Sequence, residues 1–382
     1  MYKPKNTKLS TSSFNILNAI RNDIGGEFRQ MTPLVETEGD AKAYGLYVTG
    51  SGDARNAFMN SLINRIADQW CKIRNYENSL KRFKKGMLGP GEVIENIWVG
   101  LVMPEGYTHS VANPGDVYKT NDPTNVVTFH PVNSKLVYEI TTNDSELSMA
   151  FTSDGAMYDL VSRIVGRLTD SAEWDEYIMT KYVLARAILA NPTAVKSVSE
   201  LTAANADSVV TSMKEVSNDM RFMNTGYNVA GVATHTPVES QVFFMTAKTS
   251  AVIDVNSLAS AYNLTYKQFL GQQEMLNRFD FTDAELERLN TIMTETAEAG
   301  LVPGYTQFTN EEKKTLSHIV AATVDEEFFM IFDKLYQTTA VFDQKHLNTN
   351  TYLHAWKVYS YNPFANSVFF SDEVKAAGEV VG

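Results

Sequence analysis

The sequence predicts an α+β protein in which one very long helix and one long β-hairpin stand out from a mixed body. An apolar repeat of helical period runs from Met157 to Leu189 and has capping and stop signals at its ends. Residues 83–142 hold two runs of β-forming residues around a segment rich in Pro and Gly. The rest mixes both patterns, and 44% apolar residues suffice for a large core.

The first 52 residues are expected to form an N-terminal arm. They offer one short helix that ends near Arg21, and no sustained period follows it. A second helix is expected within residues 53–82, because apolar residues recur at helical spacing from Phe58 to Trp70. This helix is predicted to pack against the body that follows.

Residues 83–142 are predicted to form an extended β-hairpin. The two apolar runs are separated by Met103 to Thr124, which is rich in Pro and Gly. An unstructured tip of roughly 20 residues is unusual inside a compact domain. We therefore expect the hairpin to leave the body of its own subunit.

The long apolar repeat predicts a helix of roughly 36 residues, or ~54 Å at 1.5 Å per residue. Ser153 or Asp154 can cap its start, and Pro192 stops it. Asp170 and Ser171 could bend it. Its length far exceeds the mean helix length of about 11–12 residues.

The remaining chain is expected to form a mixed body. Two capping boxes, Thr282 to Glu285 and Thr309 to Glu312, predict two helix starts. Aromatic, β-rich runs follow at residues 328–342 and 352–370.

Charge and cysteine content exclude several protein classes. The formal net charge of −12 disfavours binding that depends on general phosphate neutralisation. The single cysteine, Cys71, excludes an intrachain disulfide. No apolar run approaches the ~20 residues that span a bilayer, and the N-terminus shows no secretory signal. We expect a soluble protein without a membrane partner.

The sequence carries no recognisable enzyme motif, which predicts no catalytic residues, no cofactor and no metal site. No phosphate-binding P-loop, H-E-x-x-H or G-x-S-x-G motif occurs. The nearest glycine-rich loop, Gly50-Ser51-Gly52, has Arg55 where a dinucleotide fingerprint needs its third glycine. The six histidines are scattered and never paired at helical spacing. The sequence therefore indicates a protein that is not an enzyme.

A basic cluster at the base of the predicted hairpin supplies the candidate site residues, Lys81, Arg82, Lys84 and Lys85. These cations could pair with an acidic patch on a neighbouring subunit, or contact phosphate. The alternative is a solvated strand edge that its lysines protect from aggregation.

The order of these parts resembles the Hong Kong 97-type phage capsid fold. Several segments also resemble the major capsid protein of phi 29-like podophages, and they occur in the same order across most of residues 10–370. The segments are residues 13–22, 83–86, 94–97, 147–151, 171–177, 329–335 and 364–369.

The resemblance implies an α+β Hong Kong 97-type fold with an N-terminal arm, an extended β-hairpin loop, a long spine helix, and peripheral and axial domains. The expected boundaries are 1–52 for the arm, 53–82 for the packing helix, 83–142 for the hairpin loop, 143–192 for the peripheral domain with the spine helix, 193–344 for the axial domain, and 345–382 for the return to the peripheral domain and the C-terminal tail.

The resemblance also implies a function. A major capsid protein of a tailed bacteriophage would self-assemble into pentamers and hexamers of an icosahedral or prolate head that encloses double-stranded DNA without sequence specificity. Its expected partners are copies of itself, a scaffold protein, a portal at one vertex, and head fibre or decoration proteins. Assembly would occur in the host bacterial cytoplasm, and the product would be the virion capsid.

Two alternatives remain open. A shell protein of an encapsulin-like nanocompartment would share the fold. An α+β enzyme with a mobile lid at residues 83–142 would need a pocket with perturbed titratable groups, and the sequence offers no such constellation.

The negative charge is concentrated in one segment. Residues 280–327 hold eleven Asp and Glu residues against three Lys and Arg, a net charge of −8. Residues 280–324 have no evident counterpart in the family and are expected to form an inserted helical pair within the axial domain. An acidic surface there would keep packaged DNA from adhering, or keep particles apart.

Overall fold

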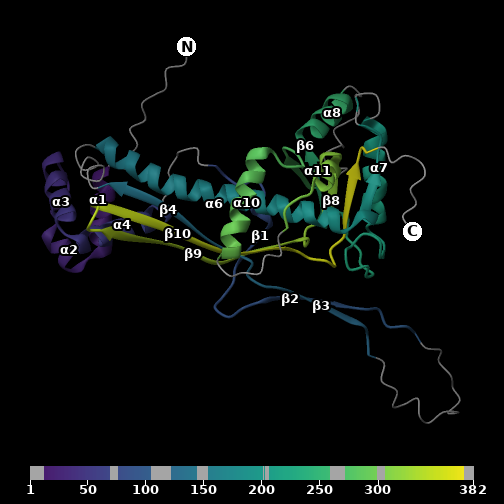
Figure 1. Cartoon of the computed structure of the whole chain (residues 1–382), viewed down its shortest axis with the longest axis horizontal. Helices are drawn as coiled ribbons and strands as arrows, with labels where there is room; N and C mark the ends of the chain where they lie inside the picture. Colours follow the sequence, from purple (N-terminus) through teal and green to yellow (C-terminus); the bar gives the residue numbers. More distant parts are fainter. Residues whose placement is uncertain are drawn as a thin grey trace, which may run out of the picture. The chain divides into compact units, whose positions relative to one another are not determined.

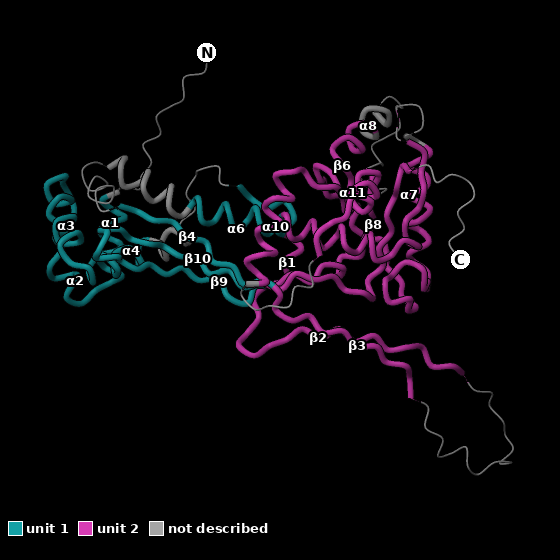
Figure 2. The backbone as a smooth tube through the Cα atoms, viewed as in Figure 1, with its two compact units in different colours: residues 1–81, 134–177, 333–356 teal, residues 82–133, 178–332, 357–382 magenta. Residues whose placement is uncertain are grey.

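The computed structural model describes residues 13–68, 76–104, 122–143, 154–200, 202, 206–258, 272–298 and 306–373. Trp70, Cys71, the hairpin tip at 105–121, the segment 147–151 and the last nine residues lie outside them. The chain forms two compact units, coloured separately in Figure 2. Unit 1 comprises residues 1–81, 134–177 and 333–356, and unit 2 comprises residues 82–133, 178–332 and 357–382.

Unit 1 begins with four helices where the sequence predicted two, a short one within the arm and a second one within residues 53–82. They are α1 (Ser13–Ile24), α2 (Gly26–Met31), α3 (Glu38–Gly50) and α4 (Gly52–Asp68). Gly25, at φ 64, permits the sharp break between α1 and α2. A capping box starts α3: the Thr37 hydroxyl accepts from the Asp40 amide at 3.3 Å, and Asp40 accepts from the Thr37 amide at 2.9 Å.

These helices share a core with the rest of unit 1. Tyr44 packs edge-on against Phe28 and Phe58, with ring centroids 5.8 and 6.0 Å apart. Leu168 and Leu353 belong to the same buried cluster. The prediction of an arm is therefore wrong for residues 13–50. Each helix is short and supplies only a few core residues, so no single window shows a long helical period.

A four-stranded sheet follows the order β1-β9-β10-β4 among the described residues. Its strands are β1 (Lys84–Met87), β9 (Phe329–Asp343), β10 (Asn348–Tyr361) and β4 (Ser134–Asn143). In unit 1, Ala340 on β9 donates its amide to the Asn60 side chain at 3.0 Å. Both aromatic runs near the C-terminus thus form strands, as the sequence predicted.

The hairpin consists of β2 (Ile94–Val99) and β3 (Asn125–His130), which pair antiparallel (Figure 1). Ile94 lies opposite His130, and Val99 lies opposite Asn125. The predicted hairpin exists, but its strand pairing is narrower than residues 83–142, because β1 and β4 join the four-stranded sheet instead. β-propensity identifies a strand without identifying its partner.

The long helix is α6 (Asp154–Ala190), with 37 residues, and it continues through Asp170 and Ser171. This confirms the predicted length and both ends. Every residue from Asp175 to Ala185 is buried, so this stretch is enclosed on all sides rather than amphipathic. Its polar side chains must therefore find partners inside the protein. Among the described helices, none is both long and apolar enough to cross a membrane.

Unit 2 contains a five-stranded sheet in the order β5-β11-β8-β6-β7 within the described chain. The strands are β5 (Val195–Ser197), β11 (Ser367–Ser371), β8 (Ile319–Asp325), β6 (Gln241–Thr246) and β7 (Gln272–Leu276). Two helices accompany it, α7 (Ala206–Asp219) and α8 (Ala247–Leu258). Met213 of α7 shares a buried cluster with Phe243 and Phe370.

The acidic segment contributes α10 (Asp283–Glu298) and α11 (Asn310–Ser317). Both predicted capping boxes are present: Thr282 and Thr309 donate their amides to Glu285 and Glu312 at 2.8 and 2.7 Å. The helical pair predicted for residues 280–324 does not fill this whole segment, however. Its last residues form β8, which pairs with both β6 and β11 and thus lies inside the sheet.

Candidate interaction surfaces

The β2–β3 hairpin has two chemically different faces. Side chains alternate along each strand, so Ile97, Val127 and Phe129 share one face. These side chains are 59%, 42% and 62% exposed. We call this the outer face. Beyond β2, Leu101 and Met103 are also exposed, and an apolar surface of this kind is typical of a protein–protein contact.

The opposite, inner face is held to the body of unit 2. Trp98 donates its indole N–H to the carbonyl of Ala233 at 3.2 Å. Asn133, just after β3, donates its side-chain amide to the Tyr359 carbonyl at 2.7 Å and accepts from the Tyr359 amide at 2.9 Å. The inner face is therefore fixed by polar contacts, and the outer face is left to solvent.

Predicted site residues form ion pairs within their own subunit. Lys81 lies 2.9 Å from Glu173, Arg82 lies 2.9 Å from Glu274, and Lys85 lies 2.5 Å from Glu327. Burial raises the pKa of Glu274, and the Arg82 charge opposes that rise. Lys84 is half-buried on β1.

The segment that carries these cations is anchored by an aromatic side chain. Phe83 is buried, with its ring centroid 5.4 Å from Phe244 and 4.8 Å from Phe329. The sequence brought the four cations together but not their acidic partners, which are 92 residues away for Lys81 and 242 for Lys85. No local pattern indicates contacts of that separation.

Two basic residues of α6 hold the acidic segment in place. The buried Lys181 ammonium lies 3.2 Å from the Glu285 carboxylate, 3.4 Å from the Asn277 side-chain oxygen and 4.6 Å from the Phe281 ring centre. Burial lowers the pKa of Lys181, and the Glu285 charge opposes that effect. Sequence reasoning missed this pair, because a lysine within an apolar helix carries no signal of its partner.

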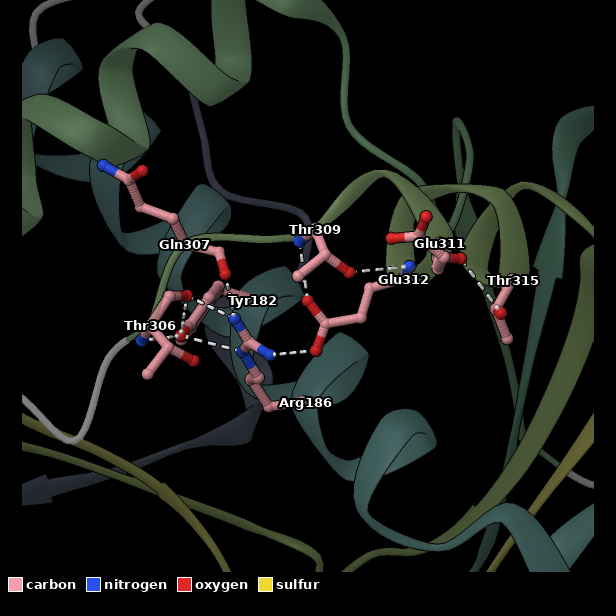
Figure 3. Close-up of polar contacts among 8 residues, drawn as sticks. All are labelled: Tyr182, Arg186, Thr306, Gln307, Thr309, Glu311, Glu312 and Thr315. Atoms are coloured by element: carbon pink, nitrogen blue, oxygen red, sulfur yellow. Dashed lines mark hydrogen bonds and ion pairs between the residues drawn. The ribbon is translucent and has the colours of Figure 1, made fainter.

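Arg186, more than one helical turn further along α6, holds the start of α11 (Figure 3). Its guanidinium donates to Glu312 at 2.8 Å, to the Tyr182 hydroxyl at 2.9 Å and to the carbonyls of Gln307, at 3.1 Å, and Thr306. Burial raises the pKa of Glu312, but hydrogen bonds from Thr309 and the Arg186 charge outweigh it, and the net pKa is lowered.

These contacts change how the acidic segment is interpreted. Glu285, Glu312, Asp280 and Glu327 each have a cationic partner in the chain. Burial also raises the pKa of Asp325. Among the residues of this segment whose exposure the structure describes, the exposed acids are Asp283, Glu287, Glu295, Glu311, Glu326 and Glu327. Part of the charge that suggested an acidic surface thus serves the internal structure of unit 2.

The described residues contain no cluster of three or more His, Cys, Asp and Glu side chains that could hold a metal ion. Gly50, Ser51 and Gly52 form the junction between α3 and α4. His318 and His346 lie beside Asp372 and Asp343 at 3.0 and 2.6 Å.

Comparison with solved structures identifies the fold. A chain from the structure of the head fibre and inner core protein of native bacteriophage P68 matches with a TM-score of 0.58 at 11% identity, covering 80% of this chain and 87% of that one. A chain from the capsid of Staphylococcus phage Andhra matches with a TM-score of 0.55 at 9% identity, covering 80% and 89%. The α+β fold expected from the sequence resemblance is therefore confirmed as that of phage capsid proteins.

The proteins of similar sequence are also phage capsid proteins. The chain is 28% identical to the major capsid protein of Bacillus phage GA-1 over 97% of its length and 71% of the relative's. It is 27% identical to that of Bacillus phage B103, over 97% and 76%, and 23% identical to that of Streptococcus phage Cp-1, over 94% of both.

The family model for Phi29-like phage major capsid proteins matches residues 17–371. Because this match covers most of the sequence, the chain belongs to the Phi29-like phage major capsid protein family.

Proposed function

We propose that this capsid protein assembles with copies of itself into pentamers and hexamers of an icosahedral or prolate head, and that the outer face of the β2–β3 hairpin is a main contact with the next subunit. The head would enclose double-stranded DNA without sequence specificity. The observation that supports the contact is the exposure of Ile97, Val127 and Phe129 on a two-stranded ribbon.

The energetic argument rests on apolar burial. Fully burying an exposed Val, Ile or Phe side chain contributes about 1.5–3 kcal/mol, and these side chains are already partly covered, so each gains part of that amount. In a ring, every subunit gives one hairpin and receives one, because a head-to-tail contact repeats around a closed symmetry axis. A modest gain per subunit is thereby multiplied through the shell.

The experiment replaces Ile97 and Phe129 together by Ser. We expect the variant to fold with a free energy of unfolding within about 1 kcal/mol of the parent, because exposed substitutions have small effects. We expect shell formation to be lost or to require much more protein, as measured by sedimentation velocity and negative-stain microscopy.

The matched control replaces Met31 and Leu46, which are also more than half exposed but lie on helices of unit 1, by Ser. If the hairpin variant forms shells at the same protein concentration as the parent, the assignment is refuted. Equal loss in both variants would also refute it, since the hairpin would then have no special role.

We assign the peripheral role to unit 1 and the axial role to unit 2, whose five-stranded sheet would lie toward the centre of each ring. A map of assembled shells is expected to place α7 nearer the ring axis than α1. The reverse placement would refute this assignment.

Further partners follow from the same proposal. Assembly would occur in the host bacterial cytoplasm with a scaffold protein and a portal at one vertex, and head fibre or decoration proteins would bind outside. The role is structural, with no catalytic step. The basic residues Lys81, Arg82, Lys84 and Lys85 are proposed as secondary subunit contacts, because Lys81 and Arg82 keep much of their side chains exposed.

A further inference from the structure

The base of the hairpin contains a buried histidine with a partner on each ring nitrogen. His130 is the last residue of β3 and is 2% exposed. Its Nδ1 lies 2.8 Å from the Ser360 hydroxyl on β10. Its Nε2 lies 3.2 Å from the side-chain nitrogen of Asn96 on β2. The imidazole therefore connects both hairpin strands to β10.

The chemistry of these partners fixes the protonation of the ring. The Asn96 nitrogen can only donate, so Nε2 must accept and carries no proton. Nδ1 then carries the single proton and donates it to Ser360. The Ser360 hydroxyl in turn donates to the Tyr361 carbonyl at 3.5 Å. The chain of donors runs in one direction from Asn96 to Tyr361, and it requires a neutral imidazole.

The surroundings also disfavour a positive charge. Burial lowers the pKa of His130, and the Lys85 charge on β1 lowers it further. Lys85 is itself paired with Glu327. On β2, Glu95 lies on the outer face, opposite Phe129. On β10, Lys357 and Tyr361 alternate to the side opposite Ser360.

We propose that His130 is an acid-sensitive latch, which holds the base of the hairpin on β10 while neutral and releases it when Nε2 is protonated. Protonation sets the new N–H against the Asn96 amide, and two donors then face each other in a buried site. The latch acts within one subunit and does not depend on what the outer face contacts.

The sign of the pH effect follows from linkage. A released histidine titrates near pKa ~6.5, and the latched one titrates lower. Well above pH ~6.5 both states are neutral, so the opening equilibrium does not vary with pH. As the pH falls from there toward the latched pKa, the open state binds the extra proton, and opening increases by up to about tenfold per pH unit.

Hydrogen exchange of the full chain measures this opening. The reporters are the Asn133 amide, which donates to the Lys357 carbonyl at 3.3 Å, and the Tyr359 amide, which donates to the Asn133 side chain. Their protection factors, corrected for the pH dependence of intrinsic exchange, are expected to vary little near pH 8 and to fall steadily as the pH drops below ~6.5. The amides of β6 provide the internal reference.

Two variants decide the assignment. His130→Gln cannot titrate, so its protection is expected not to vary with pH between 8 and 5. Asn96→Asp places a carboxylate against Nε2, so the protonated ring gains an acceptor and the acid-induced loss is expected to shrink or disappear. The Asn96→Asp result keeps the test valid even if His130→Gln folds poorly.

His318→Gln is the matched control, because His318 pairs with Asp372, and neither residue belongs to the hairpin. It is expected to keep the parent's pH dependence. A parent profile without a fall below pH 6.5, an unchanged fall in His130→Gln, or an unchanged fall in Asn96→Asp would each overturn the proposal.

Discussion

The five-stranded sheet of unit 2 and the β2–β3 hairpin use the same kinds of residue but differ in what their own chain supplies. In β6, Val242, Phe243 and Phe244 are fully buried. In the hairpin, Ile97 and Phe129 are mostly exposed. β6 lies between β8 and β7, whereas β2 and β3 pair only with each other among the described strands.

The difference separates apolar side chains that are buried within the subunit from apolar side chains that stay exposed and can be buried only by association. A two-stranded ribbon can bury one face against its own body and leaves the other without a cover. The five-stranded sheet needs no second molecule to bury its aromatic residues. Substitutions should therefore affect subunit stability in the sheet and assembly in the hairpin.

The largest expected effect comes from removing the same side chain in the two regions. Phe244→Ala is expected to lower the free energy of unfolding by about 3–5 kcal/mol, because Phe244 packs against Phe83 and Phe329 and leaves a cavity. Phe129→Ala is expected to change it by about 0.5 kcal/mol. Denaturant unfolding of the unassembled subunit measures both. Equal losses would erase the distinction between sheet and hairpin.

The next largest effect is expected for the buried ion pair of Lys181 and Glu285. Lys181→Met is expected to lower the free energy of unfolding by about 3 kcal/mol, because Glu285 is left buried without its cation. The loss falls at the low end of the range for such pairs, since Thr282 still donates to that carboxylate. Thermal and denaturant unfolding measure this change.

A double variant provides the control for that prediction. Lys181→Met combined with Glu285→Leu removes both charges and is expected to recover part of the loss, because no unpaired charge remains. Recovery will be incomplete, since the Glu285 carboxylate also accepts a hydrogen bond from the Thr282 amide at the start of α10. If the double variant loses more free energy of unfolding than Lys181→Met and Glu285→Leu lose together, the ion pair is not the source of the effect.

The smallest effect on stability concerns the basic segment. Replacing Lys81, Arg82, Lys84 and Lys85 by Gln removes three exposed or half-exposed ion pairs, each worth about 0.2–1 kcal/mol. We expect a folded subunit with impaired assembly. Normal shells from this variant would show that these cations act only within their own subunit.

Local patterns predicted the elements that carry their own signals. The length of α6, its stop before Pro192 and the capping boxes at Thr282 and Thr309 follow from residues within a few positions of one another. The two strands of the hairpin were also found. The helices α2 and α3 were missed because each supplies few core residues, and the capping box of α3 uses Asp40 instead of Glu or Gln.

The sequence could not predict which distant residues pair with each other within the chain. It identified the basic segment and the acidic segment but not that Lys85 meets Glu327, or that Lys181 meets Glu285, 104 residues away. It assigned residues 83–142 to one hairpin and residues 280–324 to an inserted helical pair, although residues 134–143 and 319–325 form the strands β4 and β8. The structure places both in sheets formed with distant strands.

By itself the sequence determined the length and ends of the main helix, the helix starts that two capping boxes mark, the two strands of the hairpin, and which capsid family the chain resembles. The tertiary structure alone decided which strands pair, which charges are neutralised inside the subunit, and which hairpin face is left uncovered. The physical reason is the separation along the sequence over which each interaction acts. Helix periods and caps act within about four residues, whereas burial and ion pairing depend on neighbours that only the folded chain brings together.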